Sequence, residues 1–320
     1  MQGSQKRFCT QKGHILNTVH AHDIEKNSIA PSTLYLVATP IRNLADLSAR
    51  AIKVLSGVDF IAAEDTRNTG HLLSYLGIQK PLVSYFEHNK RERGEAICTR
   101  LSAGESCALV TDAGTPAISD PGEDLVALCA ERGITVTSIP GPCAGITALT
   151  LSGLPTGRFT FEGFLSVNKA DRRRHLKSLT RESRTMIFHE APHKLRTTLS
   201  DLAEAFGIDR RIALCRELTK LNEEVLRMTI GEAVAYYETN APRGEYVLVL
   251  DGAPADAANE TPFWQALSIP DHVAHYMGEG MTKKDAIKSA ARDRGVPKNE
   301  VYQQVLDGKE HPTYENSALH

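Results

Sequence analysis

The chain has 320 residues, of which 41% are hydrophobic and 24% charged, with a formal net charge of −2. This is the composition of a globular protein, and the length allows two domains with a small appendage. No apolar run approaches the ~20 residues that span a bilayer, and the net charge does not favour a uniformly basic nucleic-acid binder.

The first 31 residues are polar and precede the first apolar segment. They lack the apolar core of a signal peptide and the arginine bias of a transit peptide, so we expect residues 1–31 to be a disordered leader. The six cysteines are scattered, without the spacing of a metal site or a redox pair. We therefore expect reduced thiols in a cytoplasmic protein that binds no metal.

Residues 32–154 alternate apolar strands with helical stretches. The predicted strands are residues 34–38, 60–63, 107–111 and 135–139. The predicted helices are residues 44–55, 70–76, 92–103 and 125–132. Strands that are apolar on both faces and separated by helices favour a mainly parallel sheet in an α/β domain.

Residues 155–252 form a second predicted α/β domain with some antiparallel pairing. Its strands are expected at residues 159–164, 185–189, 211–216, 224–229 and 245–250. Its helices are expected at residues 169–180, 193–206 and 230–239.

Beyond the second domain we expect a linker (253–269), a helical appendage (270–310) and a tail (311–320). The appendage contains two predicted helices, residues 283–294 and 298–306. A helix–turn–helix-like unit and a simple helical hairpin both remain open.

Glycine and proline are concentrated in two loops that follow predicted strands, DAGTPAISDPG (112–122) and PGPCAG (140–145). Such loops expose backbone groups and let a ligand approach closely, and ligands of open α/β sheets bind outside the carboxyl ends of strands. An adenosine joined to a methionine-like tail suits a cleft of this kind. The loop after the first strand, VATPIRNL (37–44), lacks the glycine fingerprints of dinucleotide and phosphate loops, so a nicotinamide enzyme is disfavoured.

Polar clusters follow other predicted strands, at residues 63–67 (AEDTR), 84–89 (SYFEHN), 188–193 (FHEAPH) and 216–220 (RELTK). Carboxylates and an arginine in the first cluster are placed to meet a substrate, or they pair with each other. The second cluster offers His88, and histidine is a residue type that often serves as a general base.

Two stretches are basic although the chain as a whole is not. Residues 166–196 contain nine Lys and Arg against three acids, and residues 283–298 contain six against two. This pattern permits a polyanionic partner, although a solvated helix face explains it equally well.

Together these segments resemble the tetrapyrrole-methylase superfamily and, within it, the ribosomal RNA small subunit methyltransferase I family. The resemblance runs in order over residues 34–252 through LYLVATPIRNLADLS, AEDTRNTGHLL, VTDAGTPAISDPG, SIPGPCAGITALTLSGLP, FEGFL, FHEAPHKL, CRELTKLNEE and GEYVLVL. It implies a two-domain tetrapyrrole-methylase-like α/β fold with a small C-terminal helix–turn–helix-like appendage. It also implies S-adenosylmethionine-dependent methylation of a cytidine 2′-hydroxyl in the decoding centre of 16S rRNA within the small ribosomal subunit, by a homodimer.

The sequence departs from relatives at two places. Corrin-precursor methylases usually carry Gly-Asp-Pro where this chain has Gly114-Thr115-Pro116. The ribosomal family more often has glycine at the position of Arg42.

The resemblance also implies cofactor contacts, whereas the catalytic and RNA-binding residues are hypotheses based on the chemistry and charge of the side chains. The expected cofactor contacts, largely through backbone, are Pro40, Gly114, Thr115, Pro116, Ile118, Cys143, Ala144, His189 and Glu190. The candidates for the base that removes the ribose proton are His88, Glu64 and Asp65, with Glu190 behind them, and Arg67 would hold a neighbouring phosphate. The expected RNA-binding residues are Lys169, Arg172, Arg173, Arg174, Lys177, Lys283, Lys284 and Lys288.

Other functions remain open at this point. One is a methylase of the same fold acting on a corrin precursor or a protein side chain, which would ignore ribosomal subunits. Another is a non-catalytic nucleic-acid-binding protein on a degenerate methylase fold, which would bind no cofactor.

Overall fold

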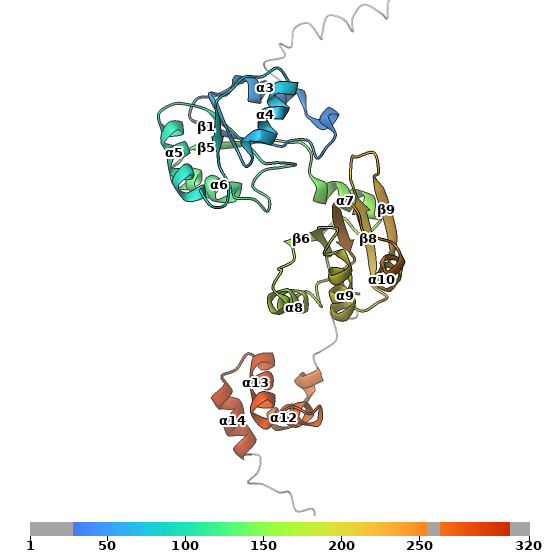
Figure 1. The fold of residues 1–320 in the computed structure, drawn as a ribbon. Coiled ribbons are helices and arrows are strands. Elements are labelled where there is room, and N and C mark those ends of the chain that lie inside the picture. Colours follow the sequence, from blue (N-terminus) through green and yellow to red (C-terminus); the bar gives the residue numbers. More distant parts are fainter. Residues whose placement is uncertain (1–27, 255–262, 308–320) are drawn as a thin grey trace, which may run out of the picture. The chain divides into compact units, whose positions relative to one another are not determined.

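The computed structural model describes residues 28–254 and 263–307 and divides the chain into two compact units, Met1–Gly252 and Ala253–His320 (Figure 1). Most of the expected leader and the whole expected tail lie outside the described residues. The last part of the expected leader is described, and there Ile29 packs against the core of the first unit. No helix in the described parts of the chain is long and apolar enough to cross a membrane.

The first sheet of the first unit is entirely parallel, with strand order β3-β2-β4-β1-β5. Its strands are β1 (Thr33–Val37), β2 (Phe60–Ala63), β3 (Leu82–Ser84), β4 (Cys107–Val110) and β5 (Thr135–Ile139). Helices α3 (Ala49–Gly57) and α4 (Thr66–Tyr75) cover one face, and α5 (Lys90–Ser102) and α6 (Gly122–Glu131) cover the other. The predicted α/β class and parallel sheet are confirmed.

The alternation of side chains along β2 shows why this sheet has a core on each face. All four residues of β2 are fully buried. Ile61 and Ala63 pack with α3 and α4, whereas Phe60 and Ala62 pack with α5 and α6. Because every second side chain points to the opposite face, a strand between two helical layers must be apolar throughout.

The part of the first unit that is built on this sheet is called the first lobe, and the part built on the other sheet is called the second lobe. Three local predictions in the first lobe were wrong. The helix expected over residues 44–55 is interrupted, because a short 3-10 turn (Leu44–Asp46) ends before Ser48, whose hydroxyl caps α3 by accepting from the Ala51 N–H. Helix α4 begins at Thr66 rather than at residue 70, because Asp65 caps it there. Strand β3 was missed; it has three half-buried residues and no distinctive period.

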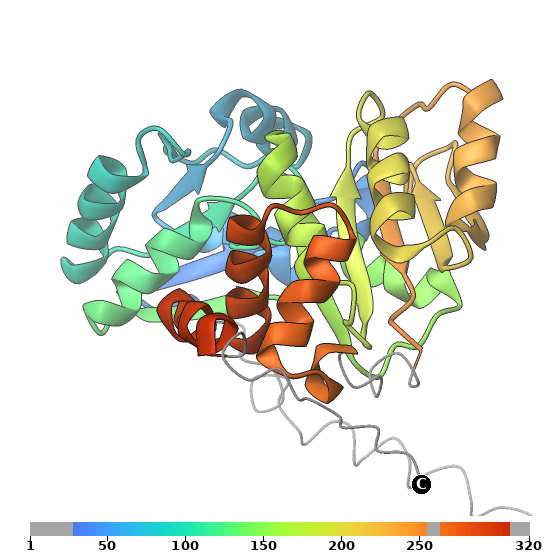
Figure 2. The ribbon, with the colours of Figure 1, turned by 90° about the horizontal axis from the view of Figure 1, so that it is seen from below.

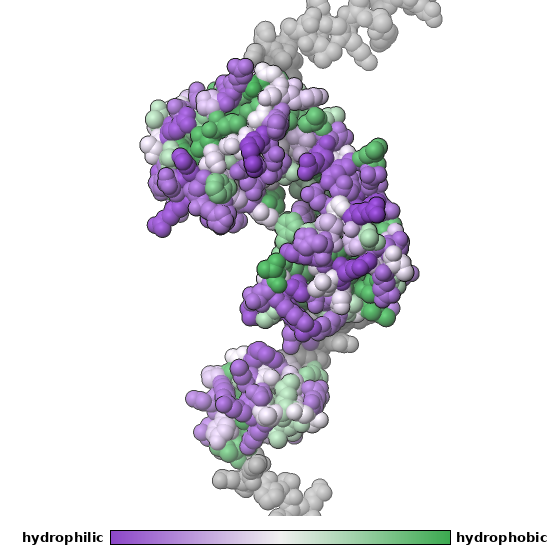
Figure 3. Space-filling model, viewed as in Figure 1, coloured by the Kyte–Doolittle hydropathy of each residue, from purple (hydrophilic) through white to green (hydrophobic). Residues whose placement is uncertain are grey.

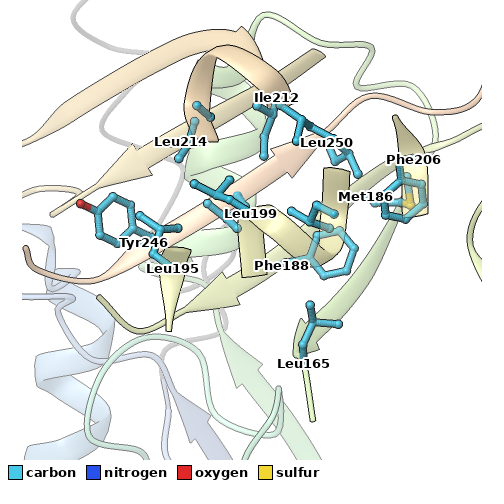
Figure 4. Packing of buried hydrophobic residues seen from close by; sticks show 14 of the residues in the cluster. Leu165, Met186, Phe188, Leu195, Leu199, Phe206, Ile212, Leu214, Tyr246 and Leu250 are labelled. Atoms are coloured by element: carbon cyan, nitrogen blue, oxygen red, sulfur yellow. The ribbon is translucent and has the colours of Figure 1, made fainter. Parts of the chain in front are cut away.

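The second sheet is mixed, with strand order β6-β7-β10-β8-β9. Its strands are β6 (Phe159–Phe164), β7 (Thr185–Glu190), β8 (Arg211–Arg216), β9 (Glu224–Thr229) and β10 (Tyr246–Leu250). Only β6 and β7 pair in parallel, and the other pairs are antiparallel, as predicted. Helices α8 (Lys169–Ser178), α9 (Leu195–Phe206) and α10 (Ile230–Thr239) supply the core on one face, part of which Figure 4 shows.

Helix α7 (Ala144–Ser152) covers the other face of the second sheet and was not predicted as a helix. Its Ala148 and Leu149 pack against Ile187 and Val249 of that sheet. The second lobe therefore includes α7. The chain was expected to pass from the first lobe to the second after residue 154, but it does so before this helix.

The second unit is a cluster of three helices in mutual contact, α12 (Ile269–Gly278), α13 (Lys283–Arg294) and α14 (Lys298–Asp307), preceded by a 3-10 turn, Phe263–Ala266 (Figures 1 and 2). Its core includes Val273, Ile287 and Val301. Helices α13 and α14 confirm the two predicted helices. Neither two-helix alternative was complete, because α12 and the 3-10 turn occupy described residues of the expected linker and the start of the appendage.

A buried histidine joins the elements of the second unit. The side chain of His272 is fully buried, and its Nδ1 accepts a 3.1 Å hydrogen bond from Arg294 Nε. The indole of Trp264 stacks on the imidazole with an interplanar angle of 12°. Arg294 also donates to the carbonyls of Trp264 and Leu267, so one guanidinium ties the 3-10 turn to α12 and α13.

Acidification is expected to loosen the second unit through His272. Burial, and then the charge of Arg294, lower the pKa of His272 from 6.5. The unfolded chain therefore binds a proton more readily, so this contribution to stability is present above the unfolded pKa and is lost as pH falls through the folded one. Hydrogen exchange of α12 and α13, corrected for intrinsic rates, should accelerate between about pH 7.5 and about pH 5.5. His272→Gln should abolish this pH dependence, and an equal acceleration in that variant would contradict the assignment.

Candidate active site

A cavity of about 840 Å³ lies in the first unit between its two sheets. It is lined by segments that follow β1, β2 and β4 of the first sheet, and by the facing ends of β7, β8 and β10 of the second. Its volume is that of sites for drug-sized or cofactor-sized ligands. Its position at the carboxyl ends of the parallel strands is where an open α/β sheet binds its ligand.

Hydrogen bonds join three loops on the first-sheet side of the cavity: the loop after β1 (37–44, the first loop) and the two glycine- and proline-rich loops, residues 112–122 (the second loop) and residues 140–145 (the third loop). Thr39 and Gly114 exchange backbone hydrogen bonds of 2.9 and 3.0 Å, which link the first loop to the second. The Thr115 hydroxyl donates to the Pro142 carbonyl at 2.9 Å, which links the second loop to the third. Gly114 has φ +88°, a conformation that favours glycine. The three loops therefore form one continuous wall.

The carboxylate of Asp120 holds the second loop in shape. It accepts hydrogen bonds from the backbone N–H groups of Ala117, Ile118 and Gly122 at 3.0, 3.2 and 2.7 Å. A side chain at Gly122 would place its Cβ 2.6 Å from this carboxylate, so glycine is required there. The motif DAGTPAISDPG thus encodes a preorganised loop.

The second lobe contributes His189, at the end of β7. Its Nε2 is buried and has no hydrogen-bond partner in the described structure. The rings of Phe161 and Phe164 meet the imidazole edge-on, with centroids 5.3 and 5.4 Å away. Burial lowers the pKa of His189, which favours the neutral imidazole. An unpartnered buried nitrogen is costly, so it suits a ligand that supplies a polar atom.

Glu190 follows His189 but has a different environment. Its carboxylate is buried and accepts from the Thr198 hydroxyl and from the Ala191 N–H. These partners occupy the carboxylate, so Glu190 orders the end of β7.

The first loop is tied to the second lobe as well. The Thr219 hydroxyl donates to the Ile41 carbonyl at 3.0 Å. Of the six non-glycine residues with positive φ among those described, five lie in or beside the cavity walls: Arg42, Ala117, Ser119, Glu217 and Thr219. Backbone strain of this kind concentrates at functional sites.

The structure places the expected cofactor residues in two groups. Pro40, Ile118, Ala144, His189 and Glu190 line the cavity. Four others belong to the hydrogen-bonded loops without lining it: Gly114, Thr115, Pro116 and Cys143.

Of the four main catalytic candidates, His88, Glu64, Asp65 and Arg67, only Glu64 lines the cavity, where it accepts a 2.7 Å hydrogen bond from the Thr111 hydroxyl. His88 is exposed in the loop before α5, beside Phe86, and does not line the cavity. Asp65 and Arg67 do not line it either. They form a two-pronged ion pair that caps α4, the pairing that the sequence had left open.

The pKa values of Asp65 and Asp112 are shifted in opposite directions. Hydrogen bonds from Arg67 lower the pKa of Asp65 to about 2, which makes it a poor base. Asp112, directly after Thr111 at the end of β4, lines the cavity and accepts a 3.4 Å hydrogen bond from Asn68. Partial desolvation of its carboxylate, although the residue is exposed at the cavity, and then the neighbouring charge of Glu64, raise the pKa of Asp112. Asp112 was not among the catalytic residues predicted from the sequence, although an aspartate that opens a glycine-rich loop after a buried strand was a usable signal.

The expected RNA-binding residues differ in how exposed they are and in whether they are paired with acidic side chains. Arg172 forms an ion pair with Asp201 in which both side chains are about nine-tenths buried, so it joins α8 to α9 and offers little free surface to RNA. Arg173 and Arg174 are exposed but paired with acids. The exposed lysines are Lys169, Lys177, Lys284 and Lys288, and Lys283 is half-buried.

Comparison with known proteins agrees with this architecture. A family model of tetrapyrrole (corrin/porphyrin) methylases matches residues 33–234. A ribosomal RNA small subunit methyltransferase I from Synechocystis is 46% identical over 86% of this chain and 97% of its own length. Its counterpart from Halalkalibacterium halodurans is 48% identical over 84% of this chain and 93% of its own length. The chain belongs to this family of tetrapyrrole methylases.

A solved structure confirms the fold from a more distant relative. The crystal structure of a cobalt-precorrin-4 methyltransferase matches with a TM-score of 0.51 and 14% identity, over 69% of this chain and 95% of the other. The predicted two-domain tetrapyrrole-methylase-like fold, whose domains are the two lobes, is therefore confirmed.

Proposed function

We propose that this protein transfers the methyl group of S-adenosylmethionine to a cytidine 2′-hydroxyl in the decoding centre of 16S rRNA. The observation that supports this best is the wall of three joined loops facing His189 across a cavity of about 840 Å³. It occurs in a chain that matches most of the length of relatives named as ribosomal RNA methyltransferases. The intact loops do not favour a degenerate, non-catalytic methylase.

The residues of the cavity fit this cofactor. Pro40, Ile118 and Ala144 line the cavity, and the backbone groups of such loops suit a ligand with its own amino, carboxyl and ribose groups. The buried His189 Nε2 offers one hydrogen bond from the second lobe. When bound, S-adenosylmethionine supplies an electrophilic methyl group. The protein then has to orient the acceptor oxygen, exclude water and take up its proton.

We propose Asp112 as the base, with Glu64 beside it. A ribose hydroxyl is a weak acid, so a carboxylate of raised proton affinity is better suited to accept its proton than one of lowered affinity. Asp112 meets this condition and lines the cavity. Glu64 is held by the Thr111 hydroxyl and places a second negative charge near Asp112.

Methyl transfer tests the proposal directly. The purified protein is incubated with radiolabelled S-adenosylmethionine and unmodified small ribosomal subunits, and the label is mapped by resistance of the modified linkage to alkali. Label at an alkali-resistant linkage in 16S rRNA is expected. Binding of the cofactor without transfer to the subunit would instead favour a corrin-precursor or protein acceptor.

The third loop should be sensitive to one added methyl group. A Cβ at Gly141 would lie 2.9 Å from the Ala38 Cβ at the end of β1, closer than real Cβ atoms approach. Gly141→Ala should therefore displace this loop and weaken S-adenosylmethionine binding by about tenfold or more. Isothermal titration would measure it. Gly157→Ala, where a Cβ meets nothing within 4 Å, should bind as wild type, and equal affinities in both variants would contradict the prediction.

The proposal includes the expected partners. The exposed lysines of α8 and α13 would contact the rRNA backbone, with salt-sensitive affinity, and the protein would act in the cytoplasm, where ribosomal subunits are.

A homodimer is supported by exposed apolar side chains on and after the edge strand β6, namely Phe159, Phe161, Phe164 and Val167. Figure 3 shows apolar surface at this edge among mostly hydrophilic neighbours. Sedimentation velocity should give twice the chain mass, and a monomer would remove this part of the proposal.

A further inference from the structure

Arg42 has a backbone conformation that is unusual for a residue with a side chain. It stands in the first loop with φ +94°, a region that glycine adopts without penalty and other residues rarely do. Both its neighbours are fixed, because the Ile41 carbonyl accepts from Thr219 and the Asn43 side chain caps the following 3-10 turn. The chain thus holds an arginine at a glycine-like position, on the wall of the cavity.

The charges that line the cavity indicate what this arginine does. Six carboxylates line it: Glu64, Asp112, Asp120, Glu190, Glu217 and Glu245. Two side chains with permanent positive charge line it, Lys220 and Arg42. Lys220 bonds Glu217 and Glu245 at 2.6 and 3.0 Å, whereas Arg42 is exposed and within 4.0 Å of no carboxylate among the described residues. The cavity therefore repels an anion except near Arg42.

We propose that Arg42 binds a backbone phosphate of the acceptor RNA and so positions the target ribose at the cavity. This inference rests on the proposed function and names the residue that admits a polyanion to an acidic site. A guanidinium offers a planar fork of donors that matches two phosphate oxygens, which an ammonium group does not. Because the loop is anchored on both sides of Arg42, the side chain starts from a fixed point. This limits the conformational entropy lost on binding.

Three variants at this position separate charge from backbone strain. Arg42→Ala removes the charge and keeps a non-glycine residue at positive φ. Arg42→Gly removes the charge and relieves the strain. Arg42→Lys keeps the charge without the fork. Lys53→Ala, an exposed cation of α3 that does not line the cavity, is the matched control.

Steady-state methylation of small ribosomal subunits and direct cofactor binding give the readout. Arg42→Ala and Arg42→Gly should both raise KM for the subunit by about 10-fold or more, with kcat and cofactor Kd within about twofold of wild type. The dependence of log KM on log salt should lose about one unit of slope. Arg42→Lys should recover part of the loss, and only Arg42→Gly should raise Tm.

Each alternative outcome identifies what failed. An unchanged KM in Arg42→Ala, with an active wild-type enzyme, overturns the phosphate contact and leaves the proposed function in place. A cofactor Kd weakened as much as KM assigns Arg42 to the cofactor instead. A wild-type protein that binds cofactor but transfers no methyl group to the subunit removes the proposed function, and this inference with it.

Discussion

Asp112→Asn is expected to lower kcat for methyl transfer by about 10²–10⁴-fold while cofactor affinity stays within a few-fold of wild type. The amide has nearly the same shape and still contacts Asn68, but it does not accept a proton. In the wild type, kcat should rise with pH through a pKa above the ordinary aspartate value of 3.8, because the base acts when ionised, and partial desolvation and the charge of Glu64 both disfavour ionisation. The variant should lack this limb of the pH profile. Single-turnover rates over a pH series measure both effects.

The stability of the same variant provides a second check. A carboxyl group whose folded pKa is raised stabilises the protein below its unfolded pKa, and this contribution is lost as pH rises through the folded pKa. Asp112→Asn should therefore not lower Tm at neutral pH. Asp65→Asn is the matched control, since asparagine also caps a helix and Asp65 faces Arg67 rather than the cavity. Equal losses of kcat in the two variants would exclude Asp112 as the base.

Phe188→Ala should destabilise the first unit by about 3–5 kcal/mol, the range for deleting a buried aromatic side chain. Phe188 is fully buried in the core between the second sheet and α8 to α10, where Figure 4 shows it near Leu165 and Met186. Removal of the ring leaves a cavity that the neighbouring side chains fill only in part. Urea unfolding followed by circular dichroism should show a lower midpoint with an unchanged slope.

The size of that effect depends on burial rather than on hydrophobicity. Leu221 is fully exposed in the loop between β8 and β9, so Leu221→Ala should change stability by no more than about 0.5 kcal/mol. If Phe188→Ala cost less than about 1 kcal/mol, the core would be loosely packed there.

Elements with a strong local signal could be predicted from the sequence. Strand β2 was predicted to the residue, because a short run that is buried on both faces must be apolar throughout. Helix α10 was likewise predicted to the residue, and its Thr229–Glu232 capping box marks its start. Helix α7 was missed since it is short and has no charged residue, so its sequence shows no clear amphipathic period.

The site was harder to predict than the fold. The sequence located the loops, because glycine and proline have local conformational causes. It did not show which side chains face the cavity, since this depends on contacts between segments far apart in the chain. His88 and Asp112 both follow strands of the first sheet, yet only Asp112 lines the cavity. The pairing of Asp65 with Arg67, by contrast, is local and follows from the helix cap.

The stacking of Trp264 on His272 has a practical consequence. Trp264 is the only tryptophan of the chain, and it lies in the second unit. Fluorescence excited beyond the tyrosine band therefore reports on that unit alone, without any introduced label. Spectral changes on adding ribosomal subunits would register an event at the helical cluster, whereas changes on adding S-adenosylmethionine would mean that the cavity and the helical cluster communicate.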